Sequence, residues 1–115
     1  MSEAQAPLTP AMLNVLLALA DGDKHGYAIL KEVGEQTGGE VQLSTGTLYG
    51  IIKRLLKDGL IVEMRRRPAA ANDDRRRYYR LTDAGREVAV AEAVRLEKLL
   101  TRARHKHLIK ALKPA

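Results

Sequence analysis

The sequence predicts a mainly α-helical domain that carries one small β-hairpin and ends in a long helix. Apolar residues recur at helical spacing over most of the chain, and the period changes to two only between residues 60 and 81. Aromatic residues are scarce, because the 115 residues include four Tyr, no Phe and no Trp. Leu, Val, Ile and Ala must therefore fill the core, a composition that suits packed helices.

The first helix should run from Thr9 to about Ala20. Thr is a good N-cap, and Pro10 at the first helical position loses no needed hydrogen bond. The apolar residues that follow at helical spacing are Leu13, Leu16 and Leu17.

The second helix is predicted over residues 27–39, after a turn at residues 21–26 ("DGDKHG"). The Gly38-Gly39 pair should end it. His25 stands just before the helix, where it should cap or buttress the first turn. The buried stripe should consist of Tyr27, Leu30, Val33 and Gly34.

A third helix should begin after Ser44 as its N-cap and reach about Lys57, where Asp58-Gly59 terminates it. Beyond the apolar stripe, Lys53 and Arg54 form a basic edge. The stripe follows the spacing i, i+3, i+4, i+7, i+8 and consists of Leu48, Ile51, Ile52, Leu55 and Leu56.

Alternation with a period of two predicts a strand at residues 60–65 and a second at residues 76–81 ("RRYYRL"). The two should form an antiparallel hairpin with a long loop. Tyr78 and Tyr79 are adjacent, so they must point to opposite faces, and one of them should pack on the helices.

Thr82 should cap a fourth helix that no proline interrupts before Pro114. About thirty residues would form a rod of about 45 Å, longer than the preceding body could cover. Small and apolar residues recur along it at coiled-coil-like spacing, which predicts a homodimer interface. The alternative is a seam against the first helix of the same chain, and both can hold on different faces. The predicted interface residues are Ala89, Ala93, Leu96, Leu100 and Ala103, and the same spacing extends to His107.

The excess positive charge of the chain is concentrated in one segment. The chain has a net charge of +6, and between Arg65 and Arg80 seven Arg oppose two Asp. A charge run by itself is usually a solvated loop. This one adjoins a helix with a basic edge, and the pair has the electrostatic footprint of a protein that binds a polyanion.

Several function classes are excluded by what the sequence lacks. The absence of Cys rules out disulfides, thiolate metal sites and a Cys nucleophile. His105 and His107 are two residues apart on a helix, so they make a poor metal pair, and no convergent catalytic set is present. We therefore expect no cofactor, no metal and no enzymatic activity. With no signal peptide and no apolar run of about 20 residues, the protein should be soluble, cytoplasmic and free of membrane contact.

Three helices followed by a hairpin is the order of a winged helix-turn-helix, in which the third helix enters the DNA major groove and the wing lies along the duplex. We expect a frayed segment at residues 1–7, the DNA-binding domain at 8–81 and a dimerisation helix at 82–115. A winged helix that binds protein instead is the alternative. The predicted contacts to double-stranded DNA are Ser44, Thr45, Thr47, Tyr49, Lys53, Arg54, Arg65, Arg66, Arg67, Arg75, Arg76 and Arg77.

Residues 43–61 ("LSTGTLYGIIKRLLKDGLI") and 75–86 ("RRRYYRLTDAGR") resemble the PadR family of bacterial transcriptional regulators. The segment "HGYAILKEV" at residues 25–33 is similar to the family's second helix, and Gly50 departs from the proline of many members. The resemblance implies a repressor that dimerises through its C-terminal helix. In some members a small-molecule effector binds an aromatic-lined pocket at the dimer interface. The fourth helix here has no aromatic residue, so we expect no such stacking pocket, and the sequence names no effector.

Overall fold

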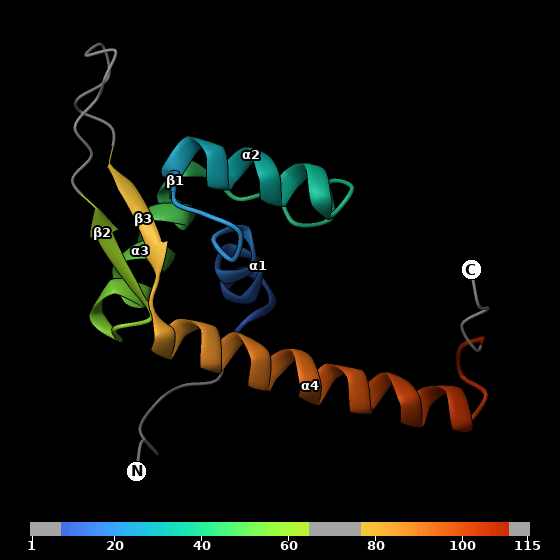
Figure 1. The fold of residues 1–115 in the computed structure, drawn as a ribbon. Coiled ribbons are helices and arrows are strands. Elements are labelled where there is room, and N and C mark those ends of the chain that lie inside the picture. The colour runs from blue at the N-terminus through green and yellow to red at the C-terminus, as the bar shows by residue number, and fades with distance from the viewer. Residues whose placement is uncertain (1–7, 65–76, 111–115) are drawn as a thin grey trace.

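The computed structural model describes residues 8–64 and 77–110. The elements follow in the order α1 (Pro10–Ala18), β1 (Lys24–His25), α2 (Gly26–Gln36), α3 (Thr45–Lys57), β2 (Ile61–Met64), β3 (Tyr78–Leu81) and α4 (Asp83–His105). In Figure 1 α1, α2 and α3 gather beside the small sheet, and α4 runs out from this body as a long rod. The predicted fold class, mainly α with a β-hairpin and a long C-terminal helix, is confirmed.

The sheet has three antiparallel strands in the order β1-β3-β2. β2 and β3 form the predicted hairpin, with Glu63 opposite Tyr79. β1 was not predicted, because its two residues lie where we expected only a turn. It pairs Lys24 with Tyr79 and His25 with Tyr78. A strand of two residues has no alternating pattern of its own, so only its distant partner defines it.

Side-chain caps fix where the first two helices start. Thr9 Oγ1 accepts a hydrogen bond from the Met12 amide at 3.1 Å. The Nδ1 atom of His25 accepts one from the Ala28 amide at 3.2 Å, which confirms the predicted capping role of this histidine. Each bond satisfies an N–H group that has no partner within its helix.

The first two helices end slightly earlier than predicted. After Ala18 the amides of Leu19 and Ala20 bond to carbonyls three residues back, in a tightened turn rather than in α-helix. α2 ends at Gln36, before Gly38 and Gly39, whose φ angles of 63° and 85° place both in the left-handed region.

The core lies between the helices and the inner face of the sheet. Tyr79 enters it with 3% of its surface exposed, whereas Tyr78 lies on the opposite face of β3 and stays half-buried, as predicted for adjacent strand residues. The largest fully buried side chains are Leu16, Leu19, Ile29, Leu48, Leu55 and Val15.

The expected core position of Tyr27 is wrong, because this side chain is 65% exposed. α2 buries Gly26, Ile29 and Val33, of which only Val33 was in the predicted stripe, so its buried face is rotated away from Tyr27. The Tyr27 ring stacks against His25, with the ring centres 6.5 Å apart.

α4 is shorter than predicted. It spans 23 residues, a rod of about 35 Å, and its C-terminal half extends past the rest of the body (Figure 1). His107 adopts a φ of 63°, and the Leu108 amide bonds to the Ala103 carbonyl at 2.9 Å, which is a left-handed helix end. His107 therefore lies outside the helical seam. Within the described residues no helix is both long and apolar enough to cross a bilayer.

A close junction anchors the start of α4. Thr82 Oγ1 donates a hydrogen bond to the Gly59 carbonyl at 2.7 Å and accepts one from the Gly85 amide at 2.9 Å. Gly85 packs so tightly against the Leu60 carbonyl that a Cβ atom would collide with it. Only glycine fits at this position without a backbone shift.

Gly85→Ala should therefore lower the free energy of unfolding by about 3 kcal/mol, because the added methyl group meets backbone rather than a flexible side chain. Urea denaturation followed by circular dichroism would measure the change. Gly34→Ala is the matched control: its Cβ meets open space within α2, so it should raise stability by about 1 kcal/mol. A Gly85→Ala protein that unfolds at the wild-type urea concentration would contradict this packing.

Candidate nucleic-acid interface

The N-terminus of α3 is built from hydroxyl side chains. Ser44 is the N-cap: its Oγ accepts a hydrogen bond from the Thr47 amide at 3.0 Å and donates one to Thr47 Oγ1 at 2.9 Å. Thr45, the first helical residue, is exposed, as are Ser44 and Thr47. The remaining amides of the first turn and the helix dipole favour an anion at this end.

The core packing of α3 determines which of its side chains face outward. Leu48, Ile52 and Leu55 are each no more than 2% exposed. Tyr49 and Lys53 lie off this stripe, with Tyr49 46% exposed and Lys53 exposed as well. The structure therefore places these two predicted contact residues on the outer side of the helix.

Lys57 is a candidate that we did not predict. It follows Lys53 by four residues, so it lies on the same face, and both ammonium groups are free of ion pairs within the described residues. Gly46 and Gly50 complete this line towards the N-terminus and are also exposed. The i, i+4 spacing from Lys53 was the signal available in the sequence.

Arg54 differs from its neighbour Lys53. Its Nε lies 3.5 Å from Asp58 Oδ2, one turn further along α3, and its Nη1 lies 3.9 Å from the Met12 sulfur. The side chain thus lies against α1 and the end of α3. Its charge is partly offset by Asp58, and its stem covers apolar surface.

The arginines at the base of the hairpin are paired with carboxylates. Arg77 is exposed and lies 3.6 Å from Glu63 Oε1 on the neighbouring strand. Arg80 makes a two-pronged contact with Asp23, with both N–O distances at 3.0 Å, and the Asp23 hydrogen bond raises the Arg80 pKa. The other predicted wing contacts, Arg65, Arg66, Arg67, Arg75 and Arg76, lie outside the described residues.

α3, the candidate recognition helix, and the hairpin meet around Tyr79. Burial is the main reason that the pKa of Tyr79 is raised; Glu63 and Tyr49 raise it further, and Arg77 lowers it. The Tyr79 hydroxyl is therefore within electrostatic reach of both Tyr49 on α3 and Arg77 at the hairpin base. The contacts agree: the Tyr49 hydroxyl lies against Gly26, and the adjacent His25 pairs with Tyr78, the residue after Arg77.

The predicted dimer residues divide between two environments. Ala89 belongs to the protomer's own core, with 8% of its surface exposed, which is the intramolecular alternative we left open. Leu100 is 46% exposed and Ala93 is exposed, whereas Leu96 and Ala103 are half-buried. The 4-3 spacing missed Leu99, which is 47% exposed near Leu96 and Leu100. Other exposed apolar residues of α4 are Val90 and Val94.

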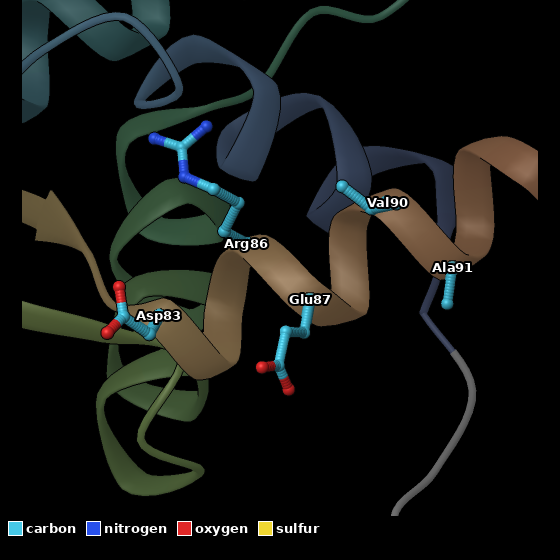
Figure 2. Close-up of a pocket in the computed structure, with 5 residues that line it drawn as sticks. All are labelled: Asp83, Arg86, Glu87, Val90 and Ala91. Carbon is cyan, nitrogen blue, oxygen red and sulfur yellow. The ribbon is translucent and has the colours of Figure 1, made fainter.

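A shallow hollow runs along the N-terminal half of α4. Figure 2 shows Arg86 pointing toward the body and Glu87 away from it. Arg86 Nη2 donates a hydrogen bond to the Ala20 carbonyl at 3.1 Å, so this guanidinium is already engaged. The described lining residues are Asp83, Arg86, Glu87, Val90 and Ala91. Within the described part of the chain, no three His, Cys, Asp or Glu residues cluster as metal ligands.

Comparison with known proteins decides the family. The sequence model of the "Transcriptional regulator PadR-like family" matches residues 15–91, more than half of the chain. The chain belongs to this family. The match runs from α1 through the hairpin into the first part of α4, so it includes every element of the candidate interface.

Relatives of this PadR-like chain include proteins of two bacteria. A transcriptional regulator of Mycobacterium tuberculosis is 34% identical over 87 residues, which cover 76% of each chain. An uncharacterized transposon protein of Streptomyces fradiae is 42% identical over 89 residues, which cover 77% of this chain and 24% of the relative. The chain thus spans about a quarter of the length of that relative.

The fold agrees with a solved member of the PadR family. The crystal structure of a PadR family transcription regulator from Clostridium difficile is 25% identical, with a TM-score of 0.73, and the match covers 88% of this chain and 100% of that one. PadR-like proteins are DNA-binding transcriptional regulators with a winged-helix fold, and the family is one of regulators rather than of enzymes.

Ser44→Ala should lower the free energy of unfolding of this PadR-like protein by about 1 kcal/mol, because it removes the acceptor for the Thr47 amide. Thermal unfolding would measure the loss. Ser44→Asp keeps an acceptor and should restore most of the stability. Thr45→Ala removes a neighbouring hydroxyl that caps no amide among the described residues, so it should leave the free energy of unfolding nearly unchanged. Equal losses for Ser44→Ala and Thr45→Ala would contradict the capping role.

Proposed function

We propose that the protein is a repressor that binds a pseudo-palindromic DNA operator as a homodimer. The observation that carries this proposal is the outer face of α3, where Tyr49 and Lys53 are exposed beside a buried stripe of Leu48, Ile52 and Leu55. Family membership accounts for regulation through DNA binding. The residue roles, the dimer and the direction of regulation are proposed here.

In this proposal α3 enters the major groove. Ser44, Thr45 and Thr47 contact a phosphate at the helix N-terminus, where amides and dipole favour an anion. Tyr49 and Lys53 reach base edges or phosphates, and Lys57 extends the same basic face.

The remaining arginines follow the duplex beside the groove. Arg77 at the hairpin base is exposed and precedes Tyr78, which pairs with His25 at the start of α2, so it suits a phosphate contact. For Arg54, contact with Asp58 and Met12 supports a role in orienting α3 beside any contact with DNA. The wing arginines that we predicted as phosphate contacts are Arg65, Arg66, Arg67, Arg75 and Arg76.

The C-terminal half of α4 supports the homodimer. Leu99 and Leu100 are nearly half exposed, one turn beyond Leu96 and before Ala103. These residues continue the apolar side of α4 past the point where Ala89 is covered by the body, and a second copy of α4 would bury them. A two-fold dimer presents two recognition helices about one helical turn of DNA apart, which implies a pseudo-palindromic operator.

Repression is the simpler outcome, because a dimer on an operator blocks access by occupancy alone. The alternative is a winged-helix module that binds protein, which would need no cationic recognition helix. The hollow on α4 has charged and aliphatic lining residues, so we propose no aromatic effector for it.

Affinity for mixed-sequence duplex DNA should fall linearly on a log–log plot as salt is raised, since each phosphate contact releases counterions. Lys53→Ala should weaken binding at every sequence and reduce the slope of this plot by about 1. Fluorescence anisotropy with a labelled duplex would measure both quantities. A salt-independent affinity of the wild-type protein would favour the protein-interaction alternative.

Two control variants separate binding from folding in this experiment. Lys98→Ala removes an exposed lysine from α4 and should leave the affinity and its salt slope unchanged. Arg54→Ala should cost stability as well as affinity, because it uncovers Met12 and frees Asp58. An unchanged operator footprint for Lys53→Ala would remove Lys53 from the interface.

Leu100→Glu should convert the dimer to a monomer, because it places a charge in the centre of the proposed contact between α4 helices. Sedimentation velocity would measure the assembly state, and operator affinity should fall together with it. Thr101→Glu adds the same charge at the next, exposed residue on a different side of the helix, so it should remain a dimer. A Leu100→Glu protein that still sediments as a dimer would place the interface elsewhere.

A further inference from the structure

The segment from His25 to Tyr27 touches both parts of the proposed DNA-binding surface. Figure 1 shows β1 passing directly into α2 beside β3, with α3 behind the sheet. His25 pairs with Tyr78 across the sheet, and Gly26 begins α2. The chain has four tyrosines: Tyr27 lies in this segment and stacks on His25, and Tyr78 and Tyr49 contact it from β3 and α3.

The His25 side chain makes two kinds of contact at once. Its Nδ1 atom accepts the Ala28 amide hydrogen bond that caps α2. Its ring meets the Tyr78 ring edge-on, with the centres 5.4 Å apart and the planes at 83°, and stacks on Tyr27 with the planes at 15°. Edge-to-face and offset stacked arrangements are the favourable geometries for such rings. The His25 imidazole therefore joins the start of α2 to β3, the second strand of the hairpin.

The next residue makes the corresponding contact with α3. The Tyr49 hydroxyl lies over Gly26 so closely that a Cβ atom at this position would collide with it. Tyr49 is one of the proposed DNA contacts. Adjacent residues thus hold β3 through Tyr78 and α3 through Tyr49.

We propose that His25 is a positioning residue that fixes the base of the wing relative to the recognition helix. β1 pairs with β3 at only two positions. The Arg80–Asp23 ion pair links the two segments at one end of this pairing, and the His25–Tyr78 ring contact links them at the other. Loss of the ring would let β3 shift against α3, and both must fit one duplex. The effect on DNA rests on the proposed function; the effect on β3 does not.

Two substitutions separate the two contacts of His25. His25→Asn keeps an N-cap acceptor but has no ring, because Asn is among the best capping residues. His25→Phe keeps a ring for Tyr78 and Tyr27 but has no acceptor. Amide hydrogen exchange of the free protein, resolved by NMR, would report on the Ala28 amide and on the β3 amides separately. Titration of a labelled mixed-sequence DNA duplex by fluorescence anisotropy, well below the melting temperature, would report on DNA binding.

His25→Asn should accelerate exchange in β3 by up to about tenfold while it preserves protection at Ala28, and the Kd for the mixed-sequence duplex should rise by a similar factor. His25→Phe should do the opposite: faster exchange at Ala28, wild-type protection in β3 and a Kd for the same duplex within about twofold of wild type.

Unchanged β3 exchange in His25→Asn would overturn the proposal, as would equal losses of affinity in both variants, which would indicate a role in α2 stability alone. The free-protein arm is independent of the proposed function. If β3 loosens in His25→Asn but the wild-type protein binds no DNA, the positioning contact stands and the proposed function fails.

Discussion

Burial of Leu48, Ile52 and Leu55 is the constraint on which the rest of this molecule depends. These side chains fix the rotation of α3 about its own axis, so they also decide that Tyr49, Lys53 and Lys57 face outward. A rotation by one residue, about 100°, would bring polar groups into the core at a cost of several kcal/mol. Specific recognition of a duplex needs a helix with a defined outer face, and here the apolar core supplies that definition.

The elements that could be predicted from the sequence are those specified by local chemistry. Ser44 and Thr82 are N-caps as expected, and Gly59, with a φ of 74°, separates α3 from β2. β1 escaped prediction because only its pairing with β3 defines it. The end of α4 escaped because His107 adopts a left-handed conformation that is uncommon for any residue other than glycine. Tyr27 was misplaced because a helical stripe alone does not fix which side of α2 meets α1.

The sequence predicted which residue types form the candidate interface, but it did not predict which of the charged side chains are exposed and which are paired. Sequence alone did not distinguish Lys53, which is exposed, from Arg54, which lies against Met12 and Asp58. Arg80 contributes to the local excess of positive charge, yet Asp23 neutralises it from a loop far away in sequence. On α4 the 4-3 spacing grouped the buried Ala89 with exposed residues. The same periodic pattern continues from the part of α4 that packs on the chain's own core into the part that extends beyond it.

The uninterrupted α4 has a mechanical consequence. One end is bound tightly to the body through Thr82 and Gly85, and the other extends beyond it with Leu99 and Leu100 uncovered. Within the proposed dimer, each winged-helix body would therefore move together with its α4 as one rigid unit. A change of a few degrees in the crossing angle of the two α4 helices would change the distance between the two winged-helix bodies. A signal that alters this angle could therefore change the fit to DNA without rearranging either body.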